Sequence, residues 1–206
     1  MRSASLTPAS SCAFWLASAI PSAATISFPV TIIDPDNTYL SYHDDLRAAI
    51  QGAGAAWAEH LEESENITLE VQVNLGLNIS TAAGSSGTSV FVHNDGVRDI
   101  WEQGAAAEVR TGIDPNGSEP DIEFDVGANY LTNELWFDPA PLLRTATVPG
   151  NKTDAVSVFI HEFGHAFAFN GWINWATGER PATYQSTFDE LTTSAIESYR
   201  FNGPRS

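Results

Sequence analysis

The sequence contains one cysteine, Cys12, and one methionine, Met1, among its 206 residues. Beyond Cys12 there is no thiol that can form a disulfide or bind a metal as a thiolate. A metal bound by the rest of the chain must therefore be held by histidine and carboxylate side chains.

Basic residues are also scarce: 9 lysines and arginines stand against 26 aspartates and glutamates, and the formal net charge is −17. A surface this acidic repels the phosphates of nucleic acids and the headgroups of anionic membranes. No cluster of basic residues offsets the charge. We therefore expect no nucleic-acid partner.

Long apolar runs are missing as well. No stretch reaches the roughly 20 apolar residues of a membrane-spanning helix, so we expect no transmembrane segment. The N-terminus instead combines Arg2, a short apolar run at residues 12–17 and small residues at 21–24, which is typical of a secretory signal peptide. We predict a signal peptide in residues 1–24, a single domain in residues 25–206, and a secreted, periplasmic or cell-surface location.

The order of apolar patterns predicts an α+β domain. Apolar residues alternate with polar ones, or cluster between turn residues, in the predicted strands at residues 27–33, 69–77, 122–126 and 135–137. Helical spacing predicts helices at residues 44–63, 97–109 and 153–170. Glycine and serine predict a loop at residues 82–88. For the last helix, we expect a cap at Thr153 or Asp154 and a stop at Gly171.

The predicted helix at residues 153–170 is almost wholly apolar around His161, Glu162 and His165. The two histidines are four residues apart and therefore share one helix face. Two imidazoles at this spacing suit tetrahedral zinc, and the intervening glutamate suits a base that takes a proton from water. The pattern predicts His161 and His165 as Zn²⁺ ligands and Glu162 as the catalytic base. The alternative is a core helix whose histidines and glutamate are satisfied by ordinary hydrogen bonds.

Residues 157–172, SVFIHEFGHAFAFNGW, resemble the active-site helix of zincin metallopeptidases, and most closely that of bacterial secreted relatives of the leishmanolysin-like group. The resemblance implies a zincin-like α+β fold, in which a twisted mixed sheet packs on helices and the active-site helix is buried. It also implies a zinc-dependent hydrolase that cleaves peptide bonds of a peptide or protein substrate. His161 and His165 would bind zinc, and Glu162 would be the general base.

The sequence departs from the metzincin pattern after His165. Compact metzincins have a glycine three residues after the second histidine and a third ligand six residues after it. This chain has Ala168 and Gly171 at those positions, and glycine has no side chain to bind a metal. No histidine follows His165, so a distant third histidine is absent, and without a methionine after Met1 there is no methionine turn.

The third zinc ligand is therefore open. A downstream carboxylate, as in gluzincins, is one explanation, with Asp189 and Glu190 in the segment 186–196 preferred among four candidates: Glu179, Asp189, Glu190 and Glu197. The explanation that we favour at this point is a truncated chain that ends before its natural third ligand. Two functions follow: a secreted zinc metallopeptidase, or a non-catalytic exported binding or surface protein on a decayed or truncated zincin scaffold.

Three weaker patterns remain. Two sets of residues have the oxygen ligands of a calcium site without the spacing of a known calcium loop, and turns explain both sets better: Asp34, Asp36 and Asn37; Asp114, Asn116 and Asp121. Trp136 and Phe137 belong either to an exposed edge strand that aligns a peptide substrate or to a buried core strand.

Overall fold

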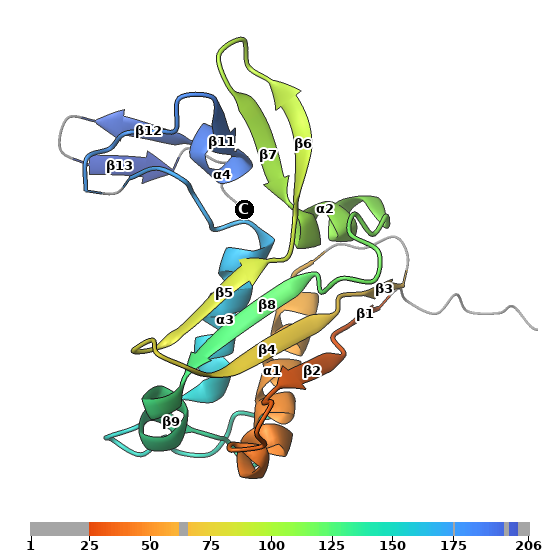
Figure 1. Cartoon of the computed structure of the whole chain (residues 1–206), viewed down its shortest axis with the longest axis vertical. Coiled ribbons are helices and arrows are strands. Elements are labelled where there is room, and N and C mark those ends of the chain that lie inside the picture. The colour runs from red at the N-terminus through yellow and green to blue at the C-terminus, as the bar shows by residue number, and fades with distance from the viewer. Residues whose placement is uncertain (1–24, 62–65, 175, 196–197, 202–206) are drawn as a thin grey trace, which may run out of the picture.

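The computed structural model describes residues 25–61, 66–174, 176–195 and 198–201, so the predicted signal peptide and Glu197 lie outside the described residues. The prediction of an α+β domain is confirmed. A four-stranded sheet has the order β2 (Val30–Ile33), β4 (Val71–Leu77), β8 (Ile122–Gly127) and β5 (Ala82–Ser86). The first three strands are parallel and β5 is antiparallel to β8, which makes the sheet mixed (Figure 1).

The central strands form where apolar and polar residues alternate, because successive side chains point to opposite faces of a sheet. In β4, Val71 and Val73 are buried and pair with Ile122 and Phe124 of β8. Their polar neighbours face the other side, where Asn74 donates a hydrogen bond to Asp125 at 2.9 Å. The alternation thus buries one face of the sheet.

Two helices, α1 (His43–Ala58) and α3 (Ala155–Phe167), cover that buried face (Figure 1). The ring of Phe163 in α3 packs at a centroid distance of 5.0 Å from Phe124 of the sheet and 5.2 Å from Phe28. The indole of Trp57 in α1 donates a hydrogen bond to the carbonyl of Ile160 at 2.9 Å. The two helices and the sheet therefore share one core.

The remaining elements extend beyond one end of the sheet or join its strands. The larger group is formed by the hairpin β6 (Ser89–Asn94) and β7 (Asp99–Gln103), helix α2 (Gly104–Thr111), β11 (Tyr184–Ser186), α4 (Thr187–Glu190), β12 (Thr192–Ala195) and β13 (Ser198–Phe201). Strand β11 pairs with β7 in parallel. The shorter elements are β1 (Ile26–Ser27), β3 (Ile67–Thr68), β9 (Leu135–Trp136), β10 (Thr153–Asp154), a 3₁₀ turn (Leu40–Tyr42) and a π turn (Tyr130–Glu134).

Several element predictions need correction. The strand predicted at residues 27–33 is interrupted at Phe28 and Pro29, because proline cannot donate to a strand ladder. The helix predicted at residues 97–109 is strand β7 followed by helix α2, since residues 99–103 pair with β6 and residues 99–101 also pair with β11. The loop predicted at residues 82–88 contains strand β5. Among the described residues, no helix combines the length and apolar character that a membrane crossing requires.

Candidate metal centre

Helix α3 begins at Ala155, directly after one of the two predicted cap residues. Asp154 is the N-cap, and its carboxylate accepts a hydrogen bond from the backbone N–H of Ser157 at 3.0 Å. The helix ends at Phe167, with Ala168 as its C-cap, so the predicted stop at Gly171 is wrong. Gly171 instead allows a close approach, because a Cβ there would lie 2.4 Å from Oδ1 of Asp189.

The two histidines of α3 lie next to each other at the solvent-accessible surface of the helix. Nε2 of His161 and Nε2 of His165 are 3.1 Å apart, with ring planes at 88°. Two nitrogens bound to one tetrahedral zinc at about 2.0–2.1 Å would lie roughly 3.3 Å apart. The separation therefore suits one shared cation, and it is also short enough for the two rings to share a proton.

The tautomer of His165 follows from its second nitrogen. Nδ1 lies 2.9 Å from the carbonyl oxygen of Phe169, and a carbonyl only accepts, so Nδ1 carries the proton. In the neutral ring, Nε2 then has a free lone pair. A backbone carbonyl that orients a histidine in this way is the usual partner of a metal-binding imidazole.

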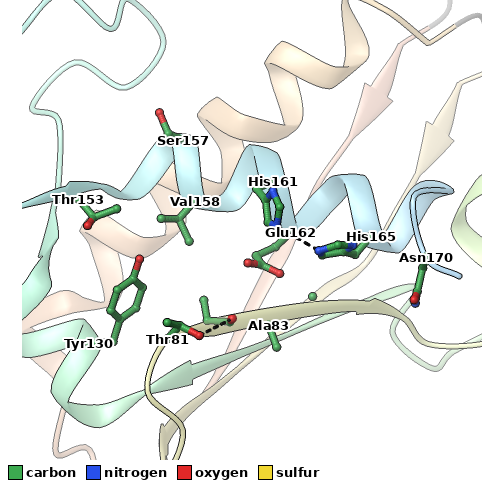
Figure 2. A pocket seen from close by; sticks show the side chains of 12 residues that line it. Thr81, Ala83, Tyr130, Thr153, Ser157, Val158, His161, Glu162, His165 and Asn170 are labelled. Carbon is green, nitrogen blue, oxygen red and sulfur yellow. Dashed lines mark hydrogen bonds between the residues drawn. The ribbon is translucent and has the colours of Figure 1, made fainter. Parts of the chain in front are cut away.

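Glu162 lies on the side of α3 that faces the sheet, and its side chain is nearly buried, with 7% of the residue exposed. Figure 2 shows its carboxylate pointing into the space between α3 and β5, beside the two histidine rings. Within the described residues, Glu162 does not join His161 and His165 in a set of three ligand atoms within 4.8 Å of one another. Its position therefore suits a group that acts on a bound molecule better than a third ligand.

A pocket of about 720 Å³ surrounds this carboxylate. Its walls are α3 and the strand β5, and Tyr130, Thr153 and Asn170 close parts of its margin (Figure 2). The volume falls within the range of ligand-binding clefts. Small side chains make the approach of β5 possible, because a Cβ on Gly84 would lie 2.6 Å from the carbonyl oxygen of Glu162.

Tyr130 adds a hydroxyl to the pocket, and sequence reasoning did not identify it. Its ring is nearly buried, and burial raises the pKa of the phenol above its ordinary value. The hydroxyl therefore stays protonated at neutral pH and can donate a hydrogen bond. No sequence motif marks Tyr130, because it reaches the pocket from a π turn far from α3 in the chain.

The structure brings none of the described third-ligand candidates to the pocket. Asp189 is fully buried, and its Oδ2 accepts hydrogen bonds from the backbone N–H groups of Trp172 at 2.7 Å and Ser186 at 3.2 Å. Glu190 lies 3.1 Å from a ring nitrogen of His93. The exposed Glu179 accepts from the hydroxyl of Thr177. The preference for Asp189 or Glu190 is therefore not supported, and Glu197 lies outside the described residues.

Asn170 is a further polar residue that lines the pocket together with His165. Its amide oxygen is an oxygen donor of the kind that metal ions accept. Sequence reasoning passed over it because only histidines and carboxylates were considered as ligands. Its position soon after His165 is the signal in the sequence that could have identified it.

No family model, no curated protein and no solved structure matches the chain.

Two of the weaker patterns have structural explanations. Asp34 accepts hydrogen bonds from the backbone N–H groups of Thr38 and Tyr39 and lies 3.0 Å from a ring nitrogen of His43, so it organises a turn. Trp136 belongs to β9, which pairs in parallel with the short β10 and not with the main sheet. The edge strand beside the pocket is β5.

Proposed function

We propose that this chain is an exported, zinc-dependent metallopeptidase with a zincin-like domain. The observation that carries the proposal is the placement of two histidine Nε2 atoms 3.1 Å apart, beside the nearly buried carboxylate of Glu162 in a pocket. The comparisons add no support, so the proposal rests on this geometry and on the resemblance of the α3 sequence. The mixed sheet covered by α1 and α3 is compatible with the zincin-like part.

The two imidazole nitrogens of His161 and His165 are donors that suit zinc. His161 and His165 would hold the ion through Nε2, and the hydrogen bond from His165 Nδ1 to the Phe169 carbonyl fixes one of the two rings. When bound, zinc supplies a Lewis acid that polarises a carbonyl and lowers the pKa of water to about 7. Among the described residues, the amide oxygen of Asn170, which lines the same pocket, is our candidate for the third donor.

Glu162 and Tyr130 have distinct tasks in this proposal. The Glu162 carboxylate accepts a proton from the attacking water and can pass it to the leaving amine. Tyr130 lines the same pocket, and its hydroxyl, which lies beside Thr153, would donate a hydrogen bond to the oxygen on which negative charge develops.

The edge of β5 favours a peptide over a small molecule. Strand β5 pairs with β8 on one side, and among the described strands no other pairs with its second edge. An unpaired strand edge beside a pocket can bind an extended peptide through backbone hydrogen bonds. Such a peptide would place a carbonyl group close to Glu162, because Gly84 of β5 contacts Glu162 directly.

A second candidate function is a non-catalytic binding or surface protein on the same scaffold. One observation favours it: in the part of the chain that the structure describes, no third histidine, cysteine or carboxylate joins His161 and His165. Two imidazoles alone bind zinc weakly compared with the usual three protein ligands of a catalytic site. Under this function, the pocket would still bind peptide along β5 without cleaving it.

Hydrolysis of an unstructured protein or a mixed peptide library distinguishes the two functions. We expect cleavage by the purified protein at neutral pH, loss of cleavage after a zinc chelator, and recovery when zinc is returned. Mass spectrometry of the products locates the cleaved bonds and separates peptide hydrolysis from hydrolysis of other amides. Peptide binding without any cleavage at saturating zinc would favour the second function and contradict the first.

A further inference from the structure

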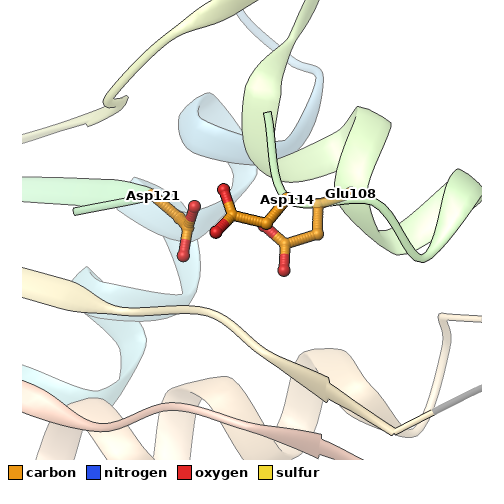
Figure 3. Close-up of side chains that lie close together, drawn as sticks. All are labelled: Glu108, Asp114 and Asp121. Carbon is orange, nitrogen blue, oxygen red and sulfur yellow. The ribbon is translucent and has the colours of Figure 1, made fainter. Parts of the chain in front are cut away.

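Three acidic side chains converge away from the histidine pocket, and the proposed peptidase does not use them. Glu108 comes from α2, Asp114 from the loop that follows, and Asp121 from the segment that enters β8 (Figure 3). One carboxylate oxygen of each lies within 4.8 Å of the other two. Three negative charges so close together repel one another unless a proton or a cation lies between them.

Two of the three carboxyl groups are buried and incompletely satisfied. Asp121 is 1% exposed and Glu108 is 5% exposed. Oδ2 of Asp121 accepts a hydrogen bond from the backbone N–H of Glu70 at 2.8 Å, whereas Oδ1 of Asp121 and Oε2 of Glu108 are buried without a hydrogen-bond partner. Buried polar atoms without partners are rare in folded proteins, and a bound ion or a shared proton would satisfy these two.

No basic side chain compensates these charges in the described part of the chain. Arg110 follows Glu108 closely on α2, but its guanidinium donates two hydrogen bonds to Glu102, at 2.6 and 3.1 Å. Burial raises the pKa of Glu108 and raises the pKa of Asp121 to about 8, and the neighbouring carboxyl groups of Glu70 and Glu108 add to the effect on Asp121. Without a bound cation, the cluster therefore keeps protons that free carboxyl groups would release.

We infer that Glu108, Asp114 and Asp121 form a binding site for a divalent cation, and that calcium is the ion that fits them. All three ligands are hard carboxylate oxygens, which calcium prefers and which distinguish this site from the imidazole pair on α3. Oxygens on opposite sides of one calcium ion lie about 4.6–5.2 Å apart, so three oxygens within 4.8 Å can share it. Asp114 is exposed and leaves one side open for water ligands.

The surrounding loop is already shaped for such an ion. Oδ1 of Asp114 accepts hydrogen bonds from the backbone N–H groups of Asn116 at 2.9 Å and Gly117 at 2.7 Å, which fixes its carboxylate. Oδ1 of Asn116 is a further buried oxygen without a hydrogen-bond partner in the same loop. A bound ion would connect α2 and this loop to the start of β8, the strand that pairs with β5. Calcium should therefore stabilise the fold.

The test measures calcium affinity by titration calorimetry and the melting temperature with millimolar calcium or with EGTA. In the wild type, we expect binding with a Kd on the order of 10⁻⁴–10⁻³ M, as in extracellular calcium-binding modules, and a melting temperature that rises by several degrees. Asp114→Asn should bind calcium at least tenfold more weakly. An asparagine can still accept the two backbone hydrogen bonds, so this variant is expected to fold.

The matched control is Asp45→Asn, which removes the same charge from an exposed position in the first turn of α1 and should leave calcium affinity unchanged. The rival explanation, a proton shared by Glu108 and Asp121, is tested with Glu108→Gln. If calcium binds, the wild type gains stability from it and Glu108→Gln does not. No calcium-dependent change in the wild type, equal affinities of the wild type and Asp114→Asn, or an equal response to magnesium would overturn the inference.

Discussion

Replacing Glu162 by glutamine is expected to lower peptide hydrolysis by about 10²–10⁴-fold, the range that a lost general base costs. The amide has nearly the shape of the carboxylate but cannot take a proton from water. Zinc content should not change, because Glu162 does not stand with His161 and His165 as a third ligand within the described residues. The assay compares kcat and bound zinc of the variant and the wild type.

Two further variants show whether the loss is specific. Glu134→Gln removes an exposed carboxylate that accepts a hydrogen bond from Asn129, and it should retain full activity. Tyr130→Phe removes the hydroxyl from the pocket, and we expect a loss of kcat of roughly tenfold or more, with zinc retained. An undiminished kcat in Glu162→Gln would show that Glu162 is not the base.

Adding one methyl group to β5 should damage both the fold and the pocket. In Gly84→Ala, the new Cβ would lie 2.6 Å from the backbone oxygen of Glu162 and 2.7 Å from its Cβ. Neither neighbour can move without shifting α3 or β5, so overpacking should lower the free energy of unfolding by about 1–3 kcal/mol. Activity should also fall, since Glu162 is displaced. Chemical denaturation and peptide hydrolysis measure the two effects.

The matched control is the same substitution on α3. A Cβ at Gly164 would come no closer than 3.5 Å to Trp57, which is an ordinary contact. Alanine also favours a helix by up to about 1 kcal/mol over glycine, so Gly164→Ala should be neutral or stabilising. Equal stability of Gly84→Ala and the wild type would contradict the described contact between β5 and α3.

Sequence patterns predicted the elements whose signals are local. The alternation around Val71 and Ile122 predicted central strands, and Asp154 was one of the two expected caps of α3. Strand β5 was missed because glycine, serine and alanine are poor strand formers. Its composition is explained by contact with α3, where Gly84 lies against Glu162, and a contact between distant segments leaves no local pattern.

The histidine pair was predictable because helical spacing alone brings His161 and His165 together. A third ligand could not be predicted in the same way, because proximity in the chain says little about proximity in the fold. A local signal did exist for Asp189: Ser186 lies three residues before it, and the two form a capping box at the start of α4. From the sequence, Asp114 and Asp121 were considered as calcium ligands but were assigned to a turn. Glu108 was not considered, because it lies in a helix and nothing in the sequence shows that it is buried beside Asp121.

The central claim is that His161 and His165 bind zinc. The most direct test is elemental analysis of the purified protein after extensive dialysis, compared with a His161→Ala/His165→Ala variant prepared in the same way. The proposal predicts about one tightly held zinc per wild-type chain and none in the variant. A wild-type protein without zinc, or equal zinc in both proteins, would contradict it and would leave the histidine pair as a structural contact of helix α3.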